Sequence, residues 1–145
     1  MMKIEFDIMG MDFTRAGEAS ARIKKALQMV GMKVETIRKA VIVAYEAELN
    51  VVIHARQGVM KACVYPDRVE ITAVDEGPGI PDISLALQEG YSTAPPHIRE
   101  MGFGAGMGLP NIKRCSDELE IESEVGLGTK LKAVIINHPD GESNA

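Results

Sequence analysis

The sequence predicts an α+β fold, a two-layer α/β sandwich in which helices cover one face of a single mixed or antiparallel sheet. Three observations predict it. The expected elements run β-α-α-β-β, then a long connection, then α-β-β, without the strict βαβ repetition of a parallel sheet. Two of the β-rich runs follow one another across a tight turn. The length of 145 residues suits one hydrophobic core, so we expect a single domain over 1–145.

The first half of the chain is expected to form one strand and two helices. Residues 2–8 alternate as a strand does. Apolar residues recur at helical spacing over 13–30, and Gly31 is a suitable stop for that helix. A longer helix is predicted over Val34–Ala55, with Gly58 as its end. The apolar side of that helix is formed by Ile37, Val41, Ala44 and Val52.

The second half is expected to be mostly strands, interrupted by one long connection. Val59–Tyr65 and Arg68–Asp75 read as a hairpin, because the turn pair Pro66-Asp67 separates them. Residues 76–105 are rich in Gly and Pro, and so long a connection is typical of a functional loop such as a lid, which we expect to be mobile when the pocket is empty. The remaining expectations are a helix over 108–117, strands over about 118–124 and 129–137, and a frayed polar tail over 138–145.

Composition excludes several classes of protein. The net charge of −5 argues against a nucleic-acid binder, and no apolar stretch approaches the length of a membrane span. The N-terminus lacks the apolar core of a signal peptide, so we expect a cytoplasmic protein. Cys63 and Cys115 lie among apolar residues without metal-ligand spacing, which predicts buried free thiols.

A run of alternating glycines is the most informative motif. Gly102, Gly104, Gly106 and Gly108 precede the sequence Leu-Pro-Asn-Ile-Lys-Arg, which has the character of a helix start. A glycine loop that leads into a helix N-terminus can bind phosphate, because free N–H groups and the positive end of the helix dipole face the anion. Such loops also serve as plain hinges, so the motif needs support from elsewhere in the chain.

The long predicted helix supplies a second motif. Glu46, Asn50 and His54 recur at four-residue spacing and therefore share one face of the helix. A carboxylate one turn from an amide can hold a proton acceptor beside a Mg²⁺–nucleotide complex, since Mg²⁺ takes oxygen ligands and keeps several waters. The alternative is an ordinary solvated helix face, and Glu48 and Arg56 are interpreted as surface charges pointing elsewhere.

Two further glycine signatures follow. Asp75-Glu76-Gly77-Pro78-Gly79 ends a predicted strand, where a carboxylate can accept a hydrogen bond from the exocyclic amine of a base. Gly126-Leu127-Gly128-Thr129 lies between the last two predicted strands. Each could be an ordinary turn.

Together these motifs resemble the Bergerat-fold ATPases, the superfamily of gyrase, Hsp90, histidine kinases and MutL. Glu46 and Asn50 match its N box, and the segments 75–79, 104–108 and 126–129 match its three glycine boxes, in order, over roughly residues 40–132. The chain looks most like the bacterial anti-sigma-factor serine/threonine kinases. The segment Gly90-Tyr-Ser-Thr93 and the run from Gly104 to Arg114 look closest to the switch-kinase branch found with stressosomes, which phosphorylates Ser or Thr on STAS-domain proteins.

The resemblance implies roles for individual residues. Glu46 would orient or deprotonate the attacking hydroxyl, Asn50 would ligate Mg²⁺, and Asp75 would bind the adenine amine. The base pocket would be lined by Gly77, Gly79 and Thr129, and the phosphates would be wrapped by Gly104, Gly106, Met107, Gly108 and Leu109. Arg99 and Lys113 are the basic residues nearest the loop, and either could reach the γ-phosphate. His54 is expected near the pocket, either as a satisfied polar residue or as a phosphate contact.

Other members of the superfamily fit less well. A sensor histidine kinase needs a phosphoacceptor histidine on a dimerising helical hairpin, and neither His97 nor His138 is placed on one. A topoisomerase or chaperone would need large extra domains, which we do not expect because both ends look complete. Two alternatives stay open: a nucleotide-gated binding module that sequesters a partner with little catalysis, and an anti-sigma factor that holds a sigma factor. The resemblance also implies a homodimer formed through the N-terminal strand region.

Overall fold

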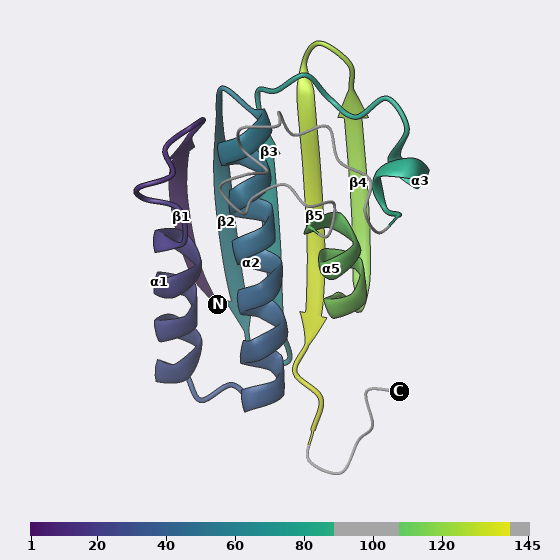
Figure 1. Cartoon of the computed structure of the whole chain (residues 1–145). Coiled ribbons are helices and arrows are strands. Elements are labelled where there is room, and N and C mark those ends of the chain that lie inside the picture. The colour runs from purple at the N-terminus through teal and green to yellow at the C-terminus, as the bar shows by residue number, and fades with distance from the viewer. Residues whose placement is uncertain (89–107, 140–145) are drawn as a thin grey trace.

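The chain folds into two layers, a sheet and a row of helices (Figure 1). The computed structural model describes residues 1–88 and 108–139. The strands are β1 Met2–Met9, β2 Gln57–Tyr65, β3 Arg68–Asp75, β4 Glu118–Glu124 and β5 Gly128–Ile136, and the helices are α1 Glu18–Met29, α2 Val34–His54, α3 Ile83–Ala86 and α5 Gly108–Cys115. The sheet order is β1-β2-β3-β5-β4, and each neighbouring pair is antiparallel. The predicted α+β sandwich is confirmed, in its antiparallel form.

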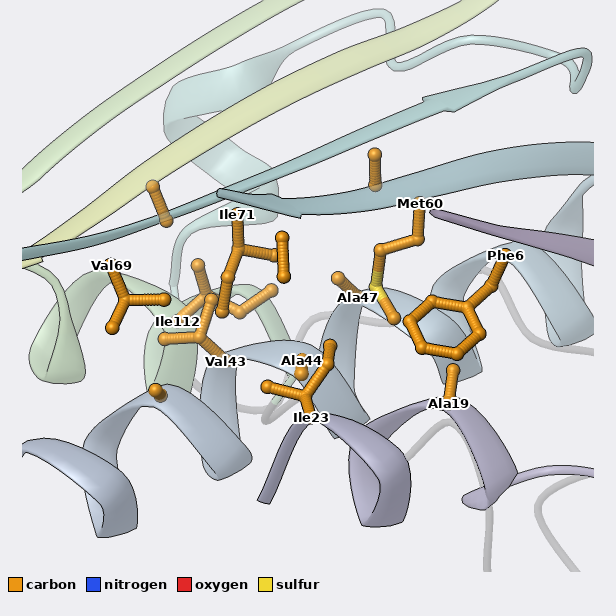
Figure 2. Close-up of a cluster of buried hydrophobic side chains, with 14 of the residues drawn as sticks. Phe6, Ala19, Ile23, Val43, Ala44, Ala47, Met60, Val69, Ile71 and Ile112 are labelled. Carbon is orange, nitrogen blue, oxygen red and sulfur yellow. The ribbon is translucent and has the colours of Figure 1, made fainter. Parts of the chain in front are cut away.

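The helices α1, α2 and α5 cover one face of the sheet, with α2 in the middle. Their apolar sides and the inward residues of the strands form one continuous core, part of which Figure 2 shows. Phe6, Met60 and Ile71 enter it from the sheet, and Val43 and Ile112 enter it from α2 and α5. Ile112 is fully buried, so it fixes α5 against α2 and the sheet.

The helix predicted to begin at Phe13 begins at Glu18. Residues 10–17 instead form turns, in which Met11 and Gly17 have positive φ angles of 63° and 96°. The Met11 N–H donates to the carbonyl of Val52 (2.7 Å). Phe13 packs against α2 from this turn segment. Phe13 is therefore apolar because it contacts α2, and not because it belongs to the first turn of α1.

The long helix ends at His54 and not at Gly58, because Ala55 already has an extended backbone. Gly58 lies inside β2, opposite Asp75 of β3. A methyl group on its Cα would lie 3.0 Å from the carbonyl oxygen of Val74 and 3.0 Å from a methyl of Val51. The glycine therefore allows the end of α2 to approach the sheet closely.

The long predicted connection begins with a short helix that the sequence did not predict, α3, capped by the Asp82 carboxylate at the Leu85 N–H (3.0 Å). Residues 89–107 and 140–145 lie outside the described residues, so the lid and the frayed tail stay predictions. Cys63 and Cys115 are free thiols, but they are half-buried rather than buried. Within the described part of the chain, no helix has the length and apolar character needed to cross a bilayer.

Candidate functional site

The face of α2 that carries Glu46 and Asn50 meets the start of α5. A methyl group placed on the Cα of Gly108 would lie 3.1 Å from Glu46 Oε2 and 3.4 Å from Asn50 Oδ1. The carboxylate, the amide oxygen and the first residue of α5 therefore converge at one point. Gly108 ends the predicted phosphate loop, so the N-terminus of α5, the end of a helix that favours anions, lies beside the Glu46 carboxylate.

The Glu46 carboxyl is half-buried, and burial raises its pKa above the usual value for a glutamate. A hydrogen bond with the side chain of Asn111 acts in the opposite direction and lowers the pKa. The net shift is upward, which makes Glu46 a stronger proton acceptor than an exposed glutamate once it is ionised.

Asp75 forms a second polar centre at the end of β3. Its Oδ1 accepts a hydrogen bond from the Thr129 N–H (3.2 Å), and the Gly77 N–H also bonds to this carboxylate. Burial raises the pKa of Asp75, and these two backbone donors lower it in part. A methyl group on the Gly77 Cα would lie 3.0 Å from Asp75 Oδ1, so the chain passes close over the carboxylate.

The first and third glycine signatures pack on each other through backbone contacts. Gly79 has a φ of 79°, and a methyl group on its Cα would lie 2.5 Å from the Glu124 carbonyl oxygen. On Gly128 a methyl group would lie 2.0 Å from the carbonyl oxygen of Asp75. Both positions exclude any other residue without backbone movement. The Gly126 N–H also donates to the Pro78 carbonyl (2.9 Å), which joins the two turns.

The two polar centres are joined where α2 ends. The Arg56 N–H donates to the Glu76 carbonyl (3.0 Å), and the Glu76 N–H donates to the Gln57 carbonyl (2.9 Å). A methyl group on Gly77 would lie 3.2 Å from the Ala55 Cα. The Asp75 centre is therefore fixed to the C-terminal end of the helix that carries Glu46 and Asn50.

The remaining predicted site residues divide into three groups. His54 lies one turn beyond Asn50, is half-buried, and has a pKa lowered by burial. Leu109 packs against the core, while Lys113 is exposed on α5. The predicted contacts that fall outside the described residues are those of Arg99, Gly104, Gly106 and Met107.

The described residues contain no cluster of three or more His, Cys, Asp or Glu side chains that could hold a metal. The donor set at Asn50 is a single amide oxygen beside a helix N-terminus. That set fits a hard cation that takes most of its ligands from phosphate and water, as Mg²⁺ does, and does not fit a cation that needs a full protein cage.

Two residues that hold this site were missed from the sequence. Asn111, in the first turn of α5, lies close enough to Glu46 to lower the pKa of its carboxyl. Ser123 of β4 accepts from the Ile80 N–H (2.7 Å) and lies 2.8 Å from the Thr129 hydroxyl. Alternation along β4 places Ser123 on the inward side with Leu119 and Ile121, which is a signal that could have identified it.

Glu48 was wrongly interpreted as a surface charge, because its side chain is 3% exposed. Its two oxygens accept from the N–H groups of Ala19 and Ser20 at the start of α1 (3.3 Å each). It therefore supplies the cap that Gly17, which has no side chain, does not. A cavity of about 210 Å³ between β1 and α1 has Glu48 in its lining and none of the predicted site residues. Arg56 is exposed, as expected.

Comparison with known proteins identifies the family of this chain. The sequence pattern of the histidine kinase-like ATPase domain matches residues 11–135. The chain is 35% identical over 105 residues to the serine/threonine-protein kinase RsbT of Bacillus subtilis (strain 168), covering 68% of this chain and 73% of RsbT. It is 31% identical over 98 residues to an anti-sigma F factor of Caldanaerobacter subterraneus, covering 68% of this chain and 61% of that protein, which is less than two thirds of its length.

Solved structures with low sequence identity share the fold. One is the SiaB–SiaC complex of Pseudomonas aeruginosa, with a TM-score of 0.66, 17% identity, and coverage of 91% of this chain and 88% of the other. Another contains the RsbU and RsbW domains of a Mycobacterium tuberculosis protein, with a TM-score of 0.62, 15% identity, and coverage of 96% and 34%. The predicted family and Bergerat fold are confirmed: the chain belongs to the histidine kinase-like ATPase domain family.

Proposed function

We propose that this member of the histidine kinase-like ATPase family is an ATP-dependent protein serine/threonine kinase, and that it acts on a STAS-domain protein in a sigma-factor partner-switching pathway. The observation that carries the proposal is the convergence of Glu46 and Asn50 on Gly108, where an added methyl group would lie 3.1 Å from Glu46 Oε2 and 3.4 Å from Asn50 Oδ1. Similarity to the kinase RsbT and to anti-sigma F factors supports the choice of reaction and of partner class. We place this activity in the cytoplasm, where ATP is available.

In the proposed reaction, the hydroxyl oxygen of a substrate Ser or Thr attacks the γ-phosphorus of ATP. The new O–P bond forms as the bond from that phosphorus to the β–γ bridging oxygen breaks, and ADP leaves with the electron pair. The hydroxyl proton passes to the Glu46 carboxylate, whose raised pKa favours its role as acceptor. The products are ADP and a phosphoserine or phosphothreonine.

The chain's own residues would position the nucleotide at both ends. Asp75 would accept a hydrogen bond from the adenine amine, with Gly77, Gly79 and Thr129 around the base. The N-terminus of α5 would face the phosphates. Asn50 would hold Mg²⁺, which when bound neutralises phosphate charge. Gly104, Gly106 and Met107 are proposed to complete the phosphate loop, with Arg99 or Lys113 at the γ-phosphate.

Two other functions are consistent with the same residues. A nucleotide-gated binding module would bind ATP and sequester a partner without phosphorylating it. An anti-sigma factor would hold a sigma factor directly, as the names of several relatives suggest. Glu46 favours the kinase, because its half-buried carboxyl beside the helix N-terminus serves proton transfer and has no use in simple binding.

The test is phosphoryl transfer from labelled ATP to a purified STAS-domain protein. Glu46→Gln keeps the shape and removes the proton acceptor, so we expect transfer to fall by about 100-fold or more while ATP binding by calorimetry is retained. Glu35→Gln is the matched control, since Glu35 is exposed on the same helix, eleven residues and about 16 Å from Glu46 along the axis.

The outcomes separate the candidate functions. Transfer that is lost in Glu46→Gln and retained in Glu35→Gln supports the kinase. ATP-dependent complex formation without transfer supports the binding module, and capture of a purified sigma factor supports the anti-sigma factor. A chain that does not bind ATP would refute the kinase and the nucleotide-gated binding module, and a chain that also fails to capture a sigma factor would refute all three.

A further inference from the structure

We propose that Ser123 is a positioning residue for the base pocket. It takes up the proton of the Thr129 hydroxyl, so that Thr129 and Asp75 present only hydrogen-bond acceptors to the base, and a 6-aminopurine is preferred to a 6-oxopurine. The proposal rests on the proposed function, because it assumes that Asp75 and Thr129 contact the base of a nucleotide.

Ser123, Thr129 and Asp75 form one polar row across the end of the sheet. Thr129 of β5 pairs with Asp75 of β3 on one side and with Ser123 of β4 on the other. Side chains of directly opposed residues lie on the same face of a sheet, and all three residues are half-buried. The next row on that face is apolar and continues the core; it is formed by Ala73, Leu131 and Ile121. The polar row therefore begins where the core ends.

The hydrogen bonds of Ser123 determine where the Thr129 proton lies. Ser123 Oγ accepts from the Ile80 N–H (2.7 Å), donates to the Gly128 carbonyl (3.2 Å), and lies 2.8 Å from Thr129 Oγ1. A hydroxyl group has one proton to donate and two lone pairs to accept with. Because the Ser123 proton goes to Gly128, Ser123 accepts the proton of Thr129, and all three contacts are then hydrogen bonds.

The polar row therefore offers acceptors to a ligand. With its proton directed to Ser123, Thr129 Oγ1 presents only a lone pair. Asp75 Oδ1 accepts from the Thr129 N–H (3.2 Å), and an ionised carboxylate has no donor of its own. The amine of adenine carries two N–H groups and can donate to both side chains. The oxygen of a 6-oxopurine carries no proton, so it would face these acceptors unpaired, which costs binding free energy.

Ser123 also holds the loop that follows Asp75. The Ile80 N–H joins this loop to β4, and the Gly126 N–H donates to the Pro78 carbonyl (2.9 Å) and joins it to the β4–β5 turn. Loss of the Ser123 hydroxyl would loosen the loop and would also release the Thr129 proton. The first effect weakens the binding of every nucleotide, whereas the second changes the preference between bases. The ratio of two affinities therefore separates positioning of Thr129 from support of the loop.

The test compares the affinity for ATP with that for ITP, which has a 6-oxo group in place of the amine, by calorimetry with Mg²⁺. In Ser123→Ala the Thr129 hydroxyl is free to donate to the 6-oxo group, so we expect the preference for ATP to fall about tenfold. Ser123→Thr keeps a hydroxyl and should keep the preference. Ser116→Ala is the matched control, because it removes another hydrogen bond from a serine to a carbonyl, that of Ile112 (2.6 Å), and should leave the preference unchanged.

Thr129→Val provides a second measurement. It removes the acceptor, so the preference for ATP should narrow, and Ser123→Ala added to Thr129→Val should narrow it no further. The proposal would be overturned by an unchanged preference in Ser123→Ala, or by an equal narrowing with and without the Thr129 hydroxyl. If Ser123→Ala does not fold, an unchanged preference in Thr129→Val would overturn it.

The calorimetric ratios do not depend on phosphoryl transfer. A chain that shows the expected ratios and transfers no phosphate would refute the proposed kinase alone. A chain that transfers phosphate with an unchanged preference in Ser123→Ala would refute the role of Ser123 alone, and one that binds neither nucleotide would refute both.

Discussion

Replacing Gly108 by alanine should lower activity without lowering stability, which is an unusual combination for a glycine beside a buried cluster. The backbone of Gly108 does not have a positive φ angle, so alanine can adopt it without strain. Gly108 is the first residue of α5, where alanine is at least as good a helix former as glycine. We therefore expect the free energy of unfolding to stay the same or to increase slightly.

The loss of activity can be sized from the contacts of the added methyl group. It would lie 3.1 Å from Glu46 Oε2, which is closer than the roughly 3.5 Å at which such atoms attract one another. The carboxylate must then retreat by about 0.4 Å. Because a misplacement of about 1 Å can cost 10²-fold in rate, a displacement of this size predicts a loss in kcat of roughly five- to tenfold. The 3.4 Å contact with Asn50 Oδ1 leaves that amide less disturbed.

The assay is single-turnover phosphoryl transfer at saturating ATP, combined with urea unfolding of the same preparations. Gly31→Ala is the opposite control. Gly31 has a φ of 76° and no atom near an added methyl group, so alanine there should cost about 1 kcal/mol of stability and leave kcat unchanged. Full activity in Gly108→Ala would refute the reasoning, because it would show that the added methyl group does not displace the Glu46 carboxylate.

Two further predictions concern buried titratable groups. Burial lowers the pKa of His54, so between its unfolded value near 6.5 and its lower folded value the unfolded chain binds more protons than the folded one. The free energy of unfolding should therefore fall as the pH drops through this window. Urea unfolding from pH 7.5 to 5 should show a weaker dependence of that free energy on pH in His54→Gln than in the unchanged protein. An equal pH dependence of the free energy of unfolding in both proteins would contradict a pKa of His54 lowered by burial. Glu48→Ala should cost roughly 1–3 kcal/mol in urea unfolding, because the N–H groups of Ala19 and Ser20 lose their acceptor, while ATP binding by calorimetry should persist. Since burial raises the pKa of Glu48, its contribution should be fully present below the unfolded pKa and weaken as pH rises through the folded one; an unchanged stability at pH 5 would show that the cap contributes nothing.

The parts of the fold that the sequence predicted are those with a strong local signal. The hairpin β2–β3 follows from two β-rich runs around Pro66-Asp67, and α2 follows from apolar spacing over more than five turns. The start of α1 was missed because Phe13 packs against a different helix, and periodicity cannot show which element an apolar residue contacts. The role of Gly58 was misread for a related reason, since a glycine that ends a helix and one that admits a close backbone contact look alike in sequence.

The candidate site shows the same division. Motif spacing brought Glu46 and Asn50 to one helix face, and the structure adds the contact with Gly108 that motif spacing could not supply. Asn111 was missed because its partner is 65 residues away, and only the packing of α5 on α2 brings the two together. Ser123 differs from Asn111 in this respect, because the alternation along β4 marks it as an inward residue in the local sequence.

The burial of Glu48 could have been predicted by combining the geometry of α2 with its central position on the sheet. Glu46 lies two residues earlier on the same helix. Two residues apart on a helix differ by about 200°, so these carboxylates point to opposite flanks of α2. The helix α2 lies on the sheet between α1 and α5, so it has a neighbouring helix on each flank (Figure 1). If Glu46 faces α5, then Glu48 must face α1 and cannot be a surface charge. A buried carboxylate needs donors, and the only unsatisfied donors that a neighbouring helix offers are at its N-terminus. The start of α1 beside Glu48, with Gly17 unable to cap it, meets that requirement.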